Sequence, residues 1–340
     1  MKLYFSLTAF FVILSAGDLD GLSEAVLEAI SRSTTLQKSD DFYGAEQALK
    51  TALRRSQASP MERSILQNEL ALVLQLRDNF LDAERHFTRA FESAAGQPDA
   101  ETWRRRIRLN LAALYVETHR PEKTRLQLEQ LDPVALEPPD IDQYRSLQAS
   151  LAVMDGDLAR GKRLHLENLH AMKARATSSR YRVDIATTQN NIGAIAVRQS
   201  DWPEAARWLA QAADGFRSEV GPNAPSLMKT LANLGTAHMK NRDFQSAKSS
   251  LGEACEIARV SLGRTHPLTI AFSERYADIL SRTGQSAMAK ALKREVREAR
   301  ATLARTATVD VSELSAFRPS APADKTGISR TRKLPELQGR

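Results

Sequence analysis

The chain has 340 residues, of which 42% are hydrophobic, 26% are charged and 6% are aromatic. These proportions are ordinary for a soluble globular protein, and the scarcity of aromatic residues means that Ala and Leu must supply most of the core. The 48 basic and 41 acidic residues give a formal net charge of +7, which is not the strong excess on one face that nucleic-acid-binding proteins carry. A single cysteine, Cys255, excludes an internal disulfide bond.

The first residues have the pattern of a secretory signal peptide. Met1-Lys2 is basic, Leu3 to Leu14 is apolar apart from Ser6 and Thr8, and Ser15-Ala16-Gly17 supplies the small residues of a cleavage site. The apolar run is too short for a membrane span, which needs about 20 residues. We therefore expect residues 1–17 to be a signal peptide; the alternative is a buried helix that caps the first repeat. Cleavage would make the protein periplasmic or extracellular, and without cleavage it would be cytoplasmic.

From Leu22 to about Arg300 the sequence predicts a succession of helices, because apolar residues recur every three or four positions. Turn signals divide this region into helix pairs. In chain order they are Asp41-Phe42-Tyr43, Pro60, Asp78-Asn79-Phe80, Arg120-Pro121, Pro138-Pro139 and Asp155-Gly156-Asp157. The helix after the last of these signals is the least regular. Three clearer pairs follow, starting near Thr187, Lys229 and Ala271.

Residues 188–283 contain a pattern that returns after 42 positions (233 − 191 and 267 − 225). Asn191-Ile192-Gly193 returns as Asn233-Leu234-Gly235, and Pro225 returns as Pro267. A fixed period of roughly 20–50 residues is the signature of stacked repeats, in which each unit packs on its neighbours. The sequence therefore predicts a solenoid.

The repeat resembles the tetratricopeptide repeat family, in which small residues recur where the two helices of a unit cross. An apolar residue and a small one occur together in the first helix, as Leu70-Ala71, Leu111-Ala112, Ile192-Gly193 and Leu234-Gly235. The second helix carries a small residue, an apolar one and an Ala, as Ala83/Phe87/Ala90, Ala205/Leu209/Ala212 and Ala247/Leu251/Ala254. The usual period of the family is about 34 residues. The longer period and the run from Leu262 to Pro267 look like the kinesin-light-chain type, in which Gly263 would end one helix and Pro267 would start the next.

This resemblance implies an all-α fold, a right-handed α-solenoid of stacked helix-turn-helix repeats. About seven helix pairs are expected over residues 18–305, best defined over 187–300. Residues 306–340 show no apolar period and contain Pro, Ser, Thr, Arg and Lys, so we predict a disordered basic tail.

No motif for catalysis or cofactor binding is evident. Phosphate-binding glycine loops and the nucleophile elbow are absent, and His165 and His170 are five residues apart, which turns them to different faces of a helix. Cys255 is expected to be a small buried thiol. We therefore expect no enzyme activity, no metal site and no cofactor.

The resemblance implies that the first helices line a concave groove. In the family, Asn often stands two positions before the small residue of the first helix and holds the backbone of an extended peptide. Here that position is occupied by Asn110, Asn191 and Asn233, with Arg275 in the last unit. An Asn side chain both donates and accepts, so it suits a peptide bond. The alternative is that these residues bridge neighbouring helices within the stack.

Positive charges also repeat with this period. Arg198, Lys240 and Arg282 stand near the ends of successive first helices, and Lys229 and Arg275 are close in sequence. They would make the groove positive and favour an acidic ligand, or would only complement the helix dipoles. A denser cluster at Arg104, Arg105, Arg106 and Arg108 is expected to be mostly solvated.

We thus predict a non-enzymatic scaffold whose groove binds an extended, acidic protein segment. The alternative is a regulatory or assembly subunit that docks on an envelope enzyme or membrane complex through its outer helices or tail. A third hypothesis, contact of the Arg cluster and tail with nucleic acid or anionic lipid, is disfavoured because no aromatic platform accompanies the cluster. No nucleic-acid partner and no stable membrane span after signal removal are expected, and the oligomeric state stays open.

Overall fold

The computed structural model describes residues 21–39, 41–55, 57–97, 100–138, 140–175 and 179–307. The predicted signal peptide and residues 308–340 of the predicted tail lie outside this part of the chain. Every regular element among the described residues is helical, and the short 3-10 turn η1 (Pro133–Ala135) accompanies the α-helices. The predicted all-α class is confirmed.

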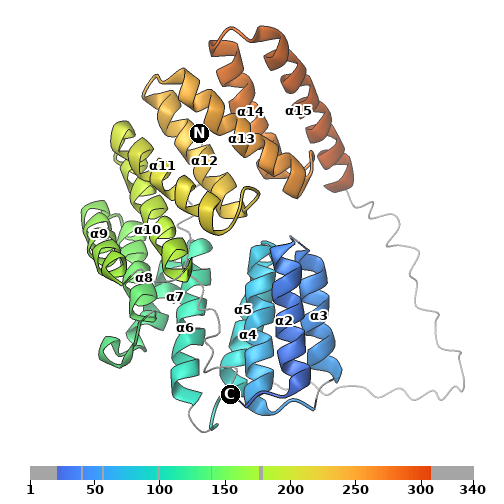
Figure 1. The fold of residues 1–340 in the computed structure, drawn as a ribbon, viewed down its shortest axis with the longest axis vertical. Helices are drawn as coiled ribbons and strands as arrows, with labels where there is room; N and C mark the ends of the chain where they lie inside the picture. The colour runs from blue at the N-terminus through green and yellow to red at the C-terminus, as the bar shows by residue number, and fades with distance from the viewer. Residues whose placement is uncertain are drawn as a thin grey trace, which may run out of the picture.

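The described helices follow one another as seven hairpin-like pairs (Figure 1). The pairs are α2 (Glu24–Lys38) with α3 (Phe42–Arg55), α4 (Pro60–Leu76) with α5 (Phe80–Ser93), α6 (Ala100–Glu117) with α7 (Pro121–Glu129), α8 (Asp140–Met154) with α9 (Leu158–Ala174), α10 (Ser179–Arg198) with α11 (Trp202–Glu219), α12 (Pro225–Lys240) with α13 (Phe244–Leu262), and α14 (Pro267–Arg282) with α15 (Ser286–Ala307). Each pair packs on the next, so the chain is the predicted solenoid.

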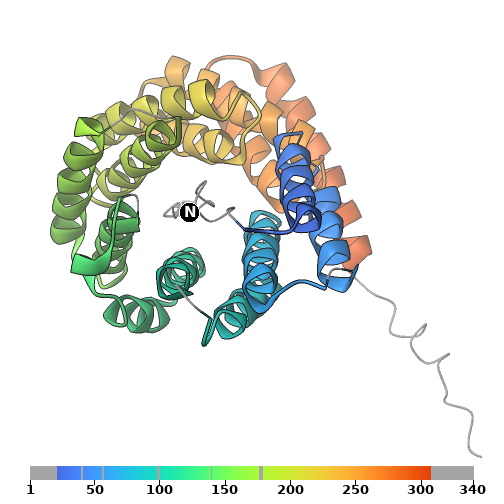
Figure 2. The same cartoon turned by 60° about the horizontal axis from the view of Figure 1, so that its bottom comes forward.

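The stack of pairs curves round an open centre, like a ring (Figure 2). Each second helix from α3 to α13 packs between the first helix of its own pair and that of the next pair. The first helices of neighbouring pairs also contact one another, as α4 contacts α2 and α6, and α10 contacts α12. Elements on the inside of a curve are crowded together, and the first helices therefore follow the inner side of the ring.

One kind of turn joins the two helices of most pairs. It contains a residue with positive φ just after the first helix, namely Asp78, His119, Gly156, Ser200, Arg242 or Gly284. The amide after it donates to a carbonyl five residues earlier, as Asp201 does to Ala196 at 2.9 Å, which is a Schellman motif that ends a helix. Asp201 and Asp243 then cap the second helices, accepting from the amides of Glu204 and Ser246 at 3.1 Å.

The small residues of the repeat are required by close helix crossings. A Cβ atom built on Gly235 would lie 2.5 Å from Leu251 Cγ, and one on Gly193 would lie 2.7 Å from Leu209 Cγ. Ala247 on the facing helix is fully buried. The interpretation that these positions are small because two helices meet there is confirmed.

Helices α10 and α12 start at Ser179 and Pro225, earlier than the predicted starts near Thr187 and Lys229. Helix α14 starts at Pro267, the residue expected to open it, whereas apolar periodicity alone placed this start near Ala271. The first turns of α12 and α14 begin with a proline, whose fixed φ suits the first position of a helix. Leu227 and Met228 in the first turn of α12 are already buried in the core.

A capping box ties the start of α4 to the start of α2. The Ser59 amide donates to Glu62 Oε2 at 2.8 Å, and the Glu62 amide donates to Ser59 Oγ at 3.2 Å. The Ser23 amide, directly before α2, donates to Glu62 Oε1 at 2.7 Å. Hydrogen bonds from Ser23 and Ser59 outweigh burial and lower the pKa of Glu62 from 4.5 to about 2.

We expect Gly235→Ala to lower the free energy of unfolding by about 1–3 kcal/mol, because the added methyl group overlaps Leu251. This loss exceeds the gain of up to about 1 kcal/mol that Ala usually brings to a helix. Urea unfolding measures the difference. In a Leu251→Ala background the overlap is absent, and Gly235→Ala should become neutral or stabilising. An equal loss in both backgrounds would contradict the crossing argument.

We expect the capping box to make stability depend on acidity. Because the pKa of Glu62 is lower in the folded chain, its contribution is complete above about pH 4.5 and is lost as the pH falls toward about 2. Glu62→Gln should flatten the stability curve in this window, as measured by urea unfolding at several pH values. The matched control is Glu129→Gln at an exposed position. A wild-type slope in the Glu62 variant would refute the assignment.

Candidate functional site

One stripe of each first helix faces the inner side of the ring. Its positions are four, three and four residues apart, a spacing that places side chains on one helix face. The inner stripe, as we call it, consists of Arg106, Asn110, Ala113 and Glu117 in α6; Gln143, Leu147, Ser150 and Met154 in α8; Thr187, Asn191, Ala194 and Arg198 in α10; Lys229, Asn233, Thr236 and Lys240 in α12; and Ala271, Arg275, Asp278 and Arg282 in α14. The predicted site residues all belong to this stripe.

The three predicted asparagines are buried in the inner stripe. Asn110 and Asn191 are 0% exposed and Asn233 is 6% exposed. Asn110 donates from Nδ2 to Asn68 Oδ1 of α4 at 3.0 Å, which is a contact of the kind that the bridging alternative describes. A role for these residues in holding a peptide stays a prediction.

Further polar contacts link one first helix to the next. They join Gln75 to Glu117 at 2.7 Å, Arg106 to Asp140 at 3.0 Å, Thr230 to Asn190 at 3.0 Å and Arg275 to Thr236 at 3.3 Å. Arg275, a predicted site residue, therefore bridges α14 and α12. These contacts, most of them made by buried side chains, hold neighbouring first helices together.

The repeating cations at the ends of the first helices contact the preceding unit. Lys240 and Arg282 are exposed, and each lies 5.9 Å from the centre of an aromatic ring, Trp202 and Phe244 respectively. Arg198 has no aromatic residue at the corresponding place and donates from Nη1 to the Val153 carbonyl oxygen at 2.9 Å. Cation–π contacts of this kind are worth about 0.5–1 kcal/mol at exposed sites. The cations thus fasten successive units while their charge stays at the surface.

The curvature brings early and late units within electrostatic range. Burial raises the pKa of Glu117 at the end of α6, and a hydrogen bond from Gln75 and the charge of Lys229 on α12 oppose the rise. Burial lowers the pKa of His266 before α14, and the charge of Asp78 in the α4–α5 turn opposes this change. Lys229 therefore lies where distant units of the chain approach one another.

The Arg cluster of α6 packs on neighbouring elements, and the expectation that it is mostly solvated is wrong. Arg104 and Arg108 stack on the Phe91 ring, 4.2 and 4.5 Å from its centre. Arg105 donates to the carbonyl oxygen of Ala135 at 3.3 Å. The arginines lie among the helices α5, α6 and α8, so their stems and guanidinium groups are part of the packing.

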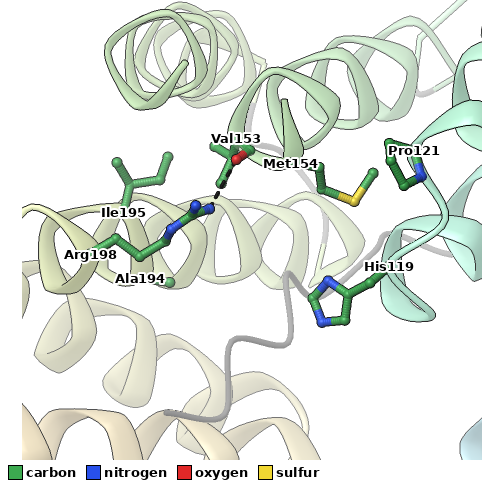
Figure 3. Close-up of a pocket in the computed structure, with 7 residues that line it drawn as sticks. All are labelled: His119, Pro121, Val153, Met154, Ala194, Ile195 and Arg198. Atoms are coloured by element: carbon green, nitrogen blue, oxygen red, sulfur yellow. Dashed lines mark hydrogen bonds between the residues drawn. The ribbon is translucent and has the colours of Figure 1, made fainter. Parts of the chain in front are cut away.

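A pocket of about 400 Å³ opens where α6, α8 and α10 end. It is lined by His119, Pro121, Val153, Met154, Ala194, Ile195 and Arg198 (Figure 3). Met154, Ala194 and Arg198 belong to the inner stripe, so the pocket lies on the face that the resemblance assigns to ligand binding. Sequence reasoning singled out only Arg198, because apolar residues near helix ends carry no distinguishing pattern.

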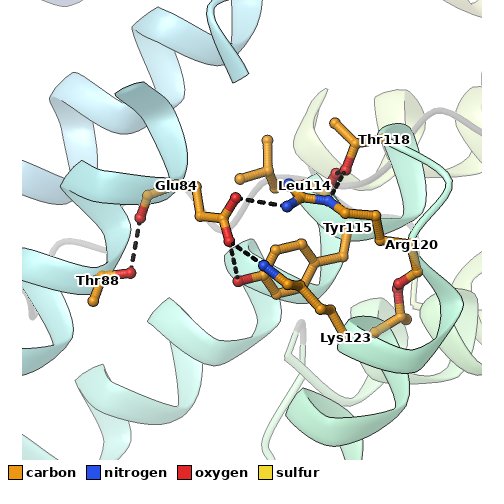
Figure 4. A network of polar contacts seen from close by, with 8 residues as sticks. Glu84, Thr88, Leu114, Tyr115, Thr118, Arg120 and Lys123 are labelled. Carbon is orange, nitrogen blue, oxygen red and sulfur yellow. Dashed lines mark hydrogen bonds and ion pairs between the residues drawn. The ribbon is translucent and has the colours of Figure 1, made fainter. Parts of the chain in front are cut away.

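A carboxylate network holds the turn that forms one side of this pocket (Figure 4). Glu84 of α5 accepts from Tyr115 Oη at 3.0 Å, from Arg120 at 2.7 Å and from Lys123 at 2.8 Å. Burial alone would raise the pKa of Glu84, but these three donors lower it. Burial and the carboxylate raise the pKa of Tyr115 to about 12. The network fixes the α6–α7 turn, which carries His119.

Other candidate groups lie apart from the pocket. The Cys255 thiol is buried, as predicted, 3.2 Å from Ser273 Oγ, and burial raises its pKa. His165 is fully buried and His170 is exposed. In the described ranges, no group of three or more His, Cys, Asp and Glu side chains could hold a metal ion. None of the described helices has the length and apolar character to cross a membrane.

Comparisons with known proteins identify the repeat. The model of the tetratricopeptide repeat family matches residues 184–259, which confirms the predicted kind of repeat in this part of the chain. No curated protein matches the sequence.

Solved structures agree on the fold. A Rap protein complexed with competence and sporulation factor is 13% identical, with a TM-score of 0.58 over 85% of this chain and 90% of that one. NprR in complex with its cognate peptide NprX is 14% identical, with a TM-score of 0.55 over 90% and 88%. At these identities the likeness shows the α-solenoid fold alone. A putative kinesin light chain from Podospora anserina, 21% identical, covers 60% of this chain and 98% of its own, with a TM-score of 0.49.

We expect Glu84→Gln to lower the free energy of unfolding by about 1–2 kcal/mol. The substitution removes the negative charge that accepts hydrogen bonds from Tyr115, Arg120 and Lys123. Urea unfolding measures the total loss. Hydrogen exchange should show faster opening of the amides in the α6–α7 turn than of those in α13. Glu92→Gln, at an exposed position of the same helix, is the control. Equal effects of the two substitutions would argue against the network.

Proposed function

We propose that the protein is a non-enzymatic scaffold that binds an extended protein segment along the inner side of the ring, on the basis of its solenoid fold and the tetratricopeptide repeat match over residues 184–259. The inner stripes of successive first helices form one continuous track, and polar contacts hold their side chains in place before a ligand arrives. Side chains that are already ordered lose little entropy on binding. This arrangement suits a ligand that lies across several units.

The observation that carries the proposal is the charge of the inner stripe in the last three units. The stripe positions of α10, α12 and α14 comprise five cations, Arg198, Lys229, Lys240, Arg275 and Arg282, and one carboxylate, Asp278. Asp278 is itself paired with Lys293 of α15 at 3.0 Å. An acidic segment complements this track, and charge complementarity chiefly raises the association rate and selects the partner.

The asparagines supply the second part of the proposed recognition. Asn191 and Asn233 occupy equivalent places in adjacent units, between the cations of the stripe. An amide group can both donate to and accept from a peptide bond whatever side chain the ligand carries. Because both side chains are buried and have partners within the protein, binding in this way requires an exchange of those partners. Among the solved structures of this fold, NprR is a complex with a peptide, which supports peptide binding by this architecture. We also propose export of the chain, on the signal-peptide pattern of residues 1–17.

Binding to an array of 15-residue peptides, graded in Asp and Glu content, tests the proposal. The full chain should bind acidic peptides at least about 10-fold more tightly than neutral ones, a difference of about 1.4 kcal/mol, and binding should weaken with salt. Asn191→Ala/Asn233→Ala should reduce binding to all peptides. Lys240→Gln/Arg282→Gln should remove mainly the preference for acidic ones.

Arg85→Gln/Arg89→Gln is the matched control, since it removes two cations from exposed positions of the second helix α5. This variant should bind as the parent chain does. Equal losses in the control and the stripe variants would overturn the inner-face proposal and favour docking through the outer helices. Circular dichroism melting establishes that each variant is folded.

A further inference from the structure

The pocket at the ends of α6, α8 and α10 interrupts an otherwise polar track. In α10, α12 and α14 the last position of the inner stripe is a cation, whereas in α8 it is Met154. The pocket beside Met154 is lined further by Pro121, Val153, Ala194 and Ile195. A ligand that follows the stripe therefore meets one apolar site, beside the first cation of the basic half.

The lining of the pocket suits a large apolar side chain, and its volume leaves room for part of the neighbouring residue as well. Its volume of about 400 Å³ falls in the lower part of the range of ligand pockets, which are mostly apolar with a few placed polar groups. Figure 3 shows Met154 and Pro121 on one side of the space and Ala194 on the other. Methionine is flexible and polarisable, so it adapts to side chains of different shape.

The position of Arg198 at the pocket favours a ligand that carries a negative charge there. Its Nη1 donates to the Val153 carbonyl oxygen at 2.9 Å. This hydrogen bond restricts the guanidinium group to a position at the pocket. A guanidinium group presents several N–H donors in one plane, and this geometry matches a carboxylate. His119 from the α6–α7 turn stands at the edge of the same pocket.

We propose that this pocket is the anchor of the bound segment: it takes one large aliphatic side chain, with a carboxylate of the adjacent residue against Arg198. The inference rests on the proposed function and specifies its ligand, an acidic segment in which an apolar residue stands next to Asp or Glu. Interfaces are generally dominated by a few buried anchors. The cations further along the stripe then act on the acidic residues that follow the anchor.

Site-directed tethering tests the anchor without a known partner. Cys255→Ser removes the native thiol, and Met154→Cys places a new one in the pocket. The probes are disulfides of cysteamine linked to Leu-Glu, Leu-Gln or Ala-Glu, which label the protein by thiol–disulfide exchange against β-mercaptoethanol. Intact mass measures the labelled fraction. We expect Leu-Glu to withstand at least about 10-fold more reductant than either other probe.

Two substitutions separate the parts of the proposal. Arg198→Gln should abolish the difference between Leu-Glu and Leu-Gln and keep that between Leu-Glu and Ala-Glu. Thr88→Cys, on the exposed face of α5, should take up the Leu-Glu and Ala-Glu probes equally. If Met154→Cys lowers the melting temperature, His119→Cys at the exposed edge of the pocket provides the same test.

Equal labelling of the pocket cysteine by the Leu and Ala probes would overturn the anchor. So would a preference for Leu-Gln over Leu-Glu. Because the probes are attached covalently, their selectivity is measured whether or not a free peptide binds. Failure of the anchor is therefore distinguishable from failure of the proposed function, which the peptide array reports.

Discussion

The whole stack depends on the close approach of helices at a few positions without side chains. Gly235 and Gly193 leave no room for even a methyl group against Leu251 and Leu209. Interiors pack at the density of organic crystals, so such a contact fixes the distance and angle of two helices. Repeating the same contact unit after unit repeats the same small rotation, and the sum of these rotations is the curvature seen in Figure 2. The inner side of the ring exists because of that regularity.

Because the units repeat, a side chain at one repeat position recurs at regular intervals along the surface. Lys240 and Arg282 each lie over the aromatic residue that begins the second helix of the preceding unit. One interaction thereby joins units and also spaces positive charges evenly along the surface. Stability and the proposed recognition consequently share residues, so substitutions in the stripe must be judged for both effects. The carboxylate network of Glu84 likewise has two effects. It holds α5 and α6 together, and it positions the α6–α7 turn beside the pocket.

Departures from the repeat carry the most information about function. Where α8 replaces a cation with Met154, the packing of the repeat does not demand the change, since neighbouring units carry charged side chains there. A pocket opens at that point. A uniform track would bind many acidic segments alike, whereas one apolar interruption sets the register in which a segment lies. Specificity in the proposed scaffold then comes from the irregular unit, and affinity for charge comes from the regular ones.

The sequence by itself determined the repeat, the helices and most of their turns. A 42-residue period, glycines at crossings and prolines at helix starts act locally, and each is legible without a neighbour. Apolar periodicity alone placed the starts of α10, α12 and α14 too late, and for α14 the proline marked the correct residue. Only the tertiary structure decided which side chains meet: Asn110 with Asn68, Arg104 with Phe91, and Lys229 within range of Glu117. These contacts depend on the rotation between units, and the pocket lies between three units. No short stretch of the chain therefore encodes either the contacts or the pocket.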